Sequence, residues 1–283
     1  MRMHARQATA TAVLILILLA ACAAAWRWAG PGRTQDQAAT DPSAVALPIP
    51  PFPPRIASGA AYEQCLSALE DDPSRALAVA EGWEASGGGD GAAHCQGLAL
   101  IAAGDPENGA ERLETLVRGS SAPPLARAAV LGQAAQARLM AAQAGRGYDD
   151  ATLALALAPD DTDLLLTRAM ASAELEHWPA TIQDLTRALT LNPSRSDALV
   201  MRAGAWRQQN RLDLALADAE HALSLDPDDA EALLERGIVR QRMGDIAGAR
   251  ADWLKARTTD PNSTTADLAE QNLALLEAGP NQR

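Results

Sequence analysis

One spacing dominates this sequence: a proline recurs with a 34-residue period, at Pro159, Pro193, Pro227 and Pro261. The six residues that end at each proline are similar, and they read ALALAP, ALTLNP, ALSLDP and ARTTDP. A fixed period of about 20–50 residues is the signature of a repeat array, in which each unit buries its apolar face against the next. The body of the chain is therefore predicted to be a stack of similar units.

Other positions keep the same period. They are an apolar set (Leu165, Leu199, Leu233), a small set (Ala169, Ala203, Gly237), a basic set (Arg168, Arg202, Arg236) and an acidic set (Asp184, Asp218, Asp252). A catalytic site needs one special constellation, and here the same charged pair occurs three times. The arginines and aspartates are therefore predicted to form ion pairs between helices or between neighbouring repeats.

This pattern resembles the tetratricopeptide repeat, a helix–turn–helix unit that stacks into a superhelix. The small residues fall where the two helices of that family cross closely, and the proline falls where the second helix ends. The resemblance is clear over residues 128–261 and weaker upstream, where it requires an insertion of four residues near Ser120–Pro124 or Gly145–Gly147. It implies an all-α fold, an α-α superhelix.

Composition supports a helical array and excludes some functions. Hydrophobic residues make up 48% of the 283-residue chain, but aromatic residues only 3%, so small side chains must supply most of the core. Such a core suits closely packed helices and fills a wide sheet sandwich poorly. The net charge of −12 argues against binding to a phosphate backbone, and no nucleic-acid partner is expected.

Residues 1–28 are predicted to be a targeting or anchoring segment. Arg2 and Arg6 precede an uncharged apolar run, Ala8–Ala25, whose length is near the lower limit for crossing a bilayer. Three readings stay open: a lipoprotein signal with Cys22 acylated after Leu-Ala-Ala, an uncleaved single-pass anchor, and a signal cleaved after Ala25. All three place the body outside the cytoplasm, so we expect a membrane-anchored protein with its body in a bacterial periplasm, as an inner-membrane single-pass protein or a lipoprotein.

The rest of the chain divides by composition and periodicity. The predicted parts are a proline-rich flexible linker (29–57), degenerate repeat-like helical pairs (58–122), the periodic repeats (123–261), and a capping helix with a tail (262–283). A glycine-rich stretch at 87–91 has no P-loop lysine and is predicted to be a loop. The last helix is expected to begin at Thr264, paired with Asp267 as a capping box.

Few residues suggest chemistry. Cys65 and Cys95 lie in an exported body on the first helices of successive units, which favours a disulfide, with two reduced buried cysteines as the alternative. His94 is nearby, but no complete set of metal ligands accompanies it. The acidic pairs at 71–72, 149–150, 160–161 and 228–229 are expected in turns as helix caps. No catalytic residue, metal or cofactor is predicted, and the chain is not expected to be an enzyme.

The family resemblance implies a concave channel lined by the first helix of each repeat, which takes a protein or peptide partner. The matching positions are Leu166, Met170, Glu174, Met201, Arg207, Gln208, Leu234, Ile238, Gln241 and Arg242. The expected function is a non-catalytic adaptor of the cell envelope. The alternatives are a self-assembling structural component, and an accessory factor of cytochrome c maturation or of outer-membrane or cell-wall assembly.

Overall fold

The computed structural model describes residues 55–278, which form thirteen α-helices and contain no strand. The predicted all-α fold is confirmed. In chain order the helices are α2 (Ala60–Asp71), α3 (Pro73–Ala85), α4 (Gly89–Ala102), α5 (Pro106–Gly119), α6 (Pro124–Met140), α7 (Ala144–Leu157), α8 (Thr162–Glu174), α9 (Trp178–Leu191), α10 (Ser196–Gln208), α11 (Leu212–Leu225), α12 (Ala230–Met243), α13 (Ile246–Thr259) and α14 (Thr264–Ala278).

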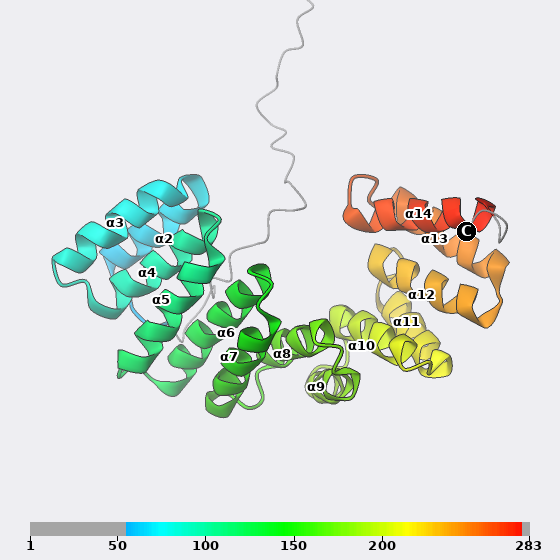
Figure 1. Ribbon diagram of the computed structural model, residues 1–283, viewed down its shortest axis with the longest axis horizontal. Helices are drawn as coiled ribbons and strands as arrows, with labels where there is room; N and C mark the ends of the chain where they lie inside the picture. Colours follow the sequence, from blue (N-terminus) through cyan, green and yellow to red (C-terminus); the bar gives the residue numbers. More distant parts are fainter. Residues whose placement is uncertain (1–54, 279–283) are drawn as a thin grey trace, which may run out of the picture. The chain divides into compact units, whose positions relative to one another are not determined.

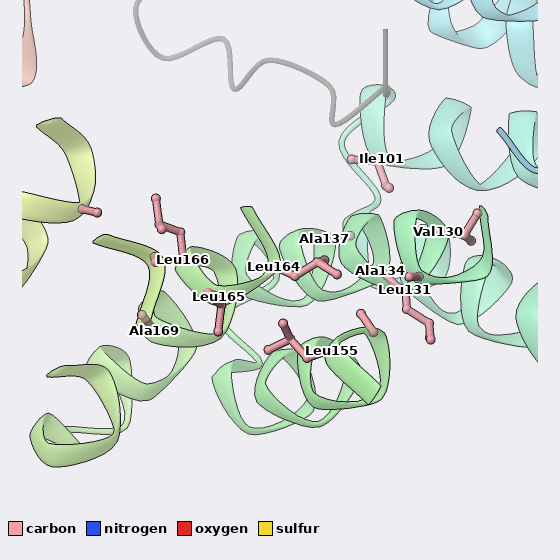
Figure 2. Close-up of a cluster of buried hydrophobic side chains, with 14 of the residues drawn as sticks. Ile101, Val130, Leu131, Ala134, Ala137, Leu155, Leu164, Leu165, Leu166 and Ala169 are labelled. Atoms are coloured by element: carbon pink, nitrogen blue, oxygen red, sulfur yellow. The ribbon is translucent and has the colours of Figure 1, made fainter. Parts of the chain in front are cut away.

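The helices form consecutive antiparallel pairs, which follow one another along the chain in Figure 1. We call the first helix of each pair helix A (even numbers, α2 to α12) and the second helix B (odd numbers). Each helix A packs on its helix B, each helix B also packs on the helix that follows it, and some A helices touch each other, as α10 and α12 do. The apolar core therefore continues from pair to pair. Figure 2 shows one part of it, with Leu131, Leu155, Leu164 and Leu165 gathered between α6, α7 and α8.

The periodic prolines end the B helices. Each proline follows the C-cap residue of its helix, and the C-caps Ala158, Asn192, Asp226 and Asp260 have φ between −139° and −135°. A residue before proline is driven to this extended region because the proline ring clashes with a helical conformation. The proline also lacks the N–H that another helical turn would need. The 34-residue period in the sequence therefore marks the end of each helix B.

The turn from helix A to helix B repeats as well. It places one residue in the left-handed region, at Ala142, Glu176, Asn210 and Gly244, with φ of 55°, 58°, 57° and 90°. These positions keep the same spacing as the prolines. Only Gly244 adopts this conformation without a steric penalty from Cβ. The turn geometry therefore overrides the local preference at Ala142 and Glu176.

Two of the helix pairs show size compensation where helix A crosses helix B. Gly237 of α12 lies against Trp253 of α13, which is fully buried and donates its indole N–H to the Leu234 carbonyl at 3.2 Å. The equivalent buried pair in the repeat formed by α8 and α9 is Ala169 and Leu185. Glycine on helix A thus accompanies the large tryptophan on helix B, and alanine accompanies the smaller leucine, whereas the repeat formed by α10 and α11 has alanine at both positions, Ala203 and Ala219.

Some details differ from the sequence predictions. The four extra residues lengthen α6 itself, which has 17 residues where α8 has 13, and the loops around it keep their lengths. The glycine-rich stretch is not entirely a loop, because α4 begins at Gly89. A Cβ on Gly91 would lie 2.5 Å from the Trp83 ring and 3.0 Å from Ala57, so this helix start packs too closely for a side chain.

The last helix begins at Thr264 as predicted, but its cap is Ser263, whose hydroxyl accepts from the Ala266 N–H at 3.2 Å. Its outer face is less polar than expected of a terminal cap, because Leu268 and Leu275 are 46% and 50% exposed. The predictions for residues 1–28, including Cys22, and for nearly all of the 29–57 linker lie outside the described residues. Within residues 55–278, no helix combines the length and apolar character needed to cross a bilayer.

Candidate functional site

The residues predicted to bind a partner lie on three A helices, α8, α10 and α12, and differ in exposure. Met170, Glu174, Gln208 and Arg242 are exposed, and Met170 keeps 46% of its surface. Met201, Arg207, Leu234, Ile238 and Gln241 are half-buried. Leu166 is buried, only 6% exposed, and belongs to the apolar core (Figure 2). Fewer residues are therefore available to a partner than the sequence predicted. We call its four exposed members the helix-A face.

Two arginines of this set also join α10 to α12. Arg207 donates from Nε to the Glu235 carboxylate at 2.5 Å. Arg242 donates to the Arg207 carbonyl at 2.7 Å and to Oδ1 of Asn210 at 3.1 Å. These bonds fix the relative position of two repeats. Substitution of either arginine would therefore disturb packing as well as any contact with a partner.

The periodic charges form the predicted ion pairs, and each pair joins helix A to helix B of one repeat. Arg168 donates through Nε and Nη2 to the two oxygens of Asp184 at 2.8 and 2.7 Å. The Arg202–Asp218 and Arg236–Asp252 pairs repeat this geometry closely, with distances of 2.7 to 2.9 Å, and the aspartates are buried. These hydrogen bonds raise the pKa of Arg168 and Arg236. We call the three pairs the Arg–Asp ladder, and its role is structural.

Cys65 of α2 and Cys95 of α4 are joined as a disulfide with their Cα atoms 6.3 Å apart. His94, next to Cys95, is buried and uses both ring nitrogens. Nδ1 lies 2.5 Å from the Tyr62 hydroxyl, and Nε2 lies 2.6 Å from Oε1 of Gln133. Burial lowers the pKa of His94 to about 4 and raises that of Tyr62 to about 12. A neutral imidazole therefore donates to Gln133 and accepts from Tyr62, and it connects α2, α4 and α6.

Three of the four acidic pairs cap helices as predicted, through Asp72, Asp161 and Asp229, each of which accepts a backbone N–H in the first turn. The fourth prediction was wrong: Asp150 lies within α7 and is buried. Its position could have been found from the period, because Asp150 precedes Asp184 by one repeat. Among residues 55–278, no group of histidine, cysteine, aspartate and glutamate side chains is arranged to hold a metal ion.

Comparison with solved structures identifies the architecture. MamA residues 41 to the end, from Desulfovibrio magneticus RS-1, are 14% identical to the chain, with a TM-score of 0.53, and the match covers 74% of this chain and 99% of that one. TTC0263, a thermophilic TPR protein in Thermus thermophilus, is 18% identical, with a TM-score of 0.53 and coverage of 66% and 99%. The chain has the tetratricopeptide-repeat fold.

YrrB, a TPR protein with an unusual peptide-binding site, gives a TM-score of 0.51 at 17% identity, and the match covers 76% of this chain and all of that one. No family model matches the chain, and no curated protein matches it. The tetratricopeptide-repeat assignment therefore depends on the sequence period and on the helix pairs.

Proposed function

We propose that this chain is a non-catalytic interaction scaffold of the bacterial cell envelope that binds a peptide or protein through the helix-A face. The observation that carries the proposal is an apolar side chain, Met170, exposed on a first helix with Glu174 one turn away. A flexible thioether can adapt to different apolar partners, and the neighbouring polar groups can hydrogen-bond to a peptide. The peptide-binding solved relative, YrrB, supports this class of function.

The envelope location has two supports. The charged start and apolar run of residues 1–28 are typical of an exported chain, and a disulfide such as Cys65–Cys95 persists in an oxidising compartment. The mass of the mature chain purified from its native membrane tests this directly. A chain that begins with an acylated Cys22 indicates a lipoprotein, an intact Met1 indicates an anchor, and a start at Trp26 indicates cleavage. An intact chain recovered from the cytosol would contradict export.

The binding surface is tested with an exposed residue that makes no structural bond. Met170→Glu places a charge on the helix-A face and should abolish capture of a partner crosslinked in native membranes. Leu225→Glu, on helix B of the following repeat, is the matched control, because Leu225 is 44% exposed against 46% for Met170. Both variants should keep the melting temperature of the unmodified chain. Capture that persists in Met170→Glu would show that the partner binds elsewhere.

Self-assembly is a second candidate, favoured by the exposed leucines of α14. Leu268 and Leu275 are separated by two helical turns, so they lie on one side of the helix. A second copy that covered them would explain why a terminal helix exposes apolar side chains. Sedimentation analysis should then show an oligomer that dissociates in Leu268→Glu/Leu275→Glu. A monomer at all concentrations in the unmodified chain would exclude this candidate.

A further inference from the structure

A cleft of about 320 Å³ lies between α5, α6 and α7 and shares no residue with the helix-A face. We call it the Asp150 cleft. Its walls are mostly apolar and are formed by Val117, Leu131, Leu153, Ala156 and Leu157, with Leu153 58% exposed at the surface. Ligand pockets typically have volumes of about 300–1,000 Å³. The cleft therefore has room for a small group, such as one amino-acid residue.

Two polar side chains that line this cleft have atoms without hydrogen-bond partners. The Nε of Arg127 is buried and makes no hydrogen bond, and neither does Oδ2 of Asp150, a residue that is 7% exposed. Buried polar atoms are nearly always satisfied, because leaving one without a partner costs about 1–3 kcal/mol. A donor and an acceptor left open in one cleft indicate a ligand that offers the complementary pair.

The periodicity explains why Asp150 lacks the arginine partner that the other ladder aspartates have. Asp150 occupies the acidic position of the Arg–Asp ladder, but the matching basic position, one repeat before Arg168, is Ala134. Ala134 is fully buried on α6 (Figure 2) and supplies no cation. The nearby Arg138 instead donates to Glu114 from Nε at 2.7 Å and from Nη2 at 2.5 Å. The ladder is thus interrupted at this repeat.

The charges around the cleft favour an anion. Glu114 of α5, already bound by Arg138 of α6 and at 3.2 Å from Arg146 of α7, faces Asp150. Burial, and then the Glu114 charge, raise the pKa of Asp150 to about 7, so that near neutrality a proton resides there for much of the time. Among the described groups, Arg118 and Arg127 add two cations to the lining. Four arginines thus surround two carboxyl groups.

We propose that the Asp150 cleft binds the carboxyl-terminal residue of a peptide when that residue has an apolar, leucine-sized side chain. The terminal carboxylate accepts from Arg127, the amide N–H of the same residue donates to Oδ2 of Asp150, and the side chain packs against Leu131 and Leu153. Oδ2 of ionised Asp150 accepts this N–H, and the protonated acid can accept it when the proton is on the other oxygen. This site is independent of the helix-A face.

Three small probes separate the parts of this recognition: N-acetyl-leucine, N-acetyl-leucinamide without the carboxylate, and 4-methylpentanoate without the amide N–H. Each is titrated into the full-length chain with methyl-labelled leucine, and dissociation constants are measured by NMR. N-acetyl-leucine should shift the methyl signals of Leu131, Leu153 and Leu157, and it should bind about tenfold more tightly than either analogue, as expected for one charge-assisted hydrogen bond.

Substitutions complete the test. Arg127→Gln should reduce the affinity for N-acetyl-leucine to that for the amide and leave the amide unaffected. The matched control is Arg187→Gln in the neighbouring cleft of about 250 Å³, where the ladder pair Arg168–Asp184 is complete, and it should change nothing. Binding should weaken from pH 6 to pH 8, because the ionised Asp150 would repel the ligand carboxylate. Equal affinity of the acid and the amide, or an unchanged affinity in Arg127→Gln, would overturn the proposal.

Discussion

The contact between Gly237 and Trp253 makes a sharp prediction about packing. A methyl group at residue 237 would lie 2.6 Å from Cδ1 and 2.9 Å from Cε2 of the Trp253 indole. Carbon atoms pack comfortably at about 3.5–4.0 Å, so one helix or the ring must move. The ring cannot move freely, because it is fully buried and its N–H is bonded to the Leu234 carbonyl. Gly237→Ala should therefore be destabilising.

Two opposing effects set the magnitude. Replacement of glycine by alanine within a helix gains roughly 1 kcal/mol from propensity. Overpacking a close contact costs about 1–3 kcal/mol and sometimes more, and the restrained ring places Gly237→Ala at the upper end. The net expectation is a loss of about 1–2 kcal/mol in the free energy of unfolding. Gly204→Ala on α10 is the matched control: a Cβ there meets no atom within 4 Å, so only the propensity gain applies.

The assay is urea unfolding of the full-length chain, followed by circular dichroism. Gly237→Ala should unfold at lower urea than the unmodified chain, and Gly204→Ala at equal or higher urea. The double variant Gly237→Ala/Trp253→Leu reproduces the residue types of the Ala169–Leu185 pair and should be more stable than the sum of its single changes predicts. The packing argument would be refuted if Gly237→Ala and Gly204→Ala had the same effect.

Other predictions follow from the described contacts. Cys65→Ser should lower the free energy of unfolding by about 3–4 kcal/mol, as expected for the loop that this disulfide closes, and reductant should have a similar effect on the unmodified chain but none on the variant. His94 is held neutral in the fold with its pKa lowered to about 4, whereas the unfolded chain protonates it below about pH 6.5. Its contribution to stability is therefore complete above about pH 6.5 and is lost as the pH falls toward 4, and urea midpoints of His94→Gln should depend less steeply on pH in that range. Glu176→Gly relieves a left-handed residue and should stabilise the chain by about 1 kcal/mol, whereas Glu174→Gly, two residues earlier in α8, should destabilise it by a similar amount. Thermal unfolding that shifts both glutamate variants in the same direction would contradict that assignment.

Much of the architecture could be read from the period, because each periodic residue acts within its own repeat. Pro193 ends a helix through its own ring, and Arg168 reaches Asp184 across one pair of helices. The partner surface was harder to predict. Leu166 lies in a position that the family resemblance assigns to the channel, yet the packing of the A helices buries it. Which side of a helix remains exposed to solvent depends on how the neighbouring repeat packs, and the residue type at one position does not determine it.

The sequence by itself determined the helix stops, the helix pairing and the Arg–Asp ladder, since these depend on local sterics and on contacts between adjacent helices. Only the tertiary structure decided how the interrupted ladder is accommodated. The period alone shows that Ala134 stands at the arginine position of the ladder and Asp150 at its buried aspartate position. The cleft beside Asp150 also requires Glu114 and Arg138 to pair across α5 and α6. Their pairing depends on how α5 packs against α6. Charge compensation here involves side chains from several helices at once. For that reason, only the folded chain shows that Arg127 Nε and Asp150 Oδ2 have no hydrogen-bond partner.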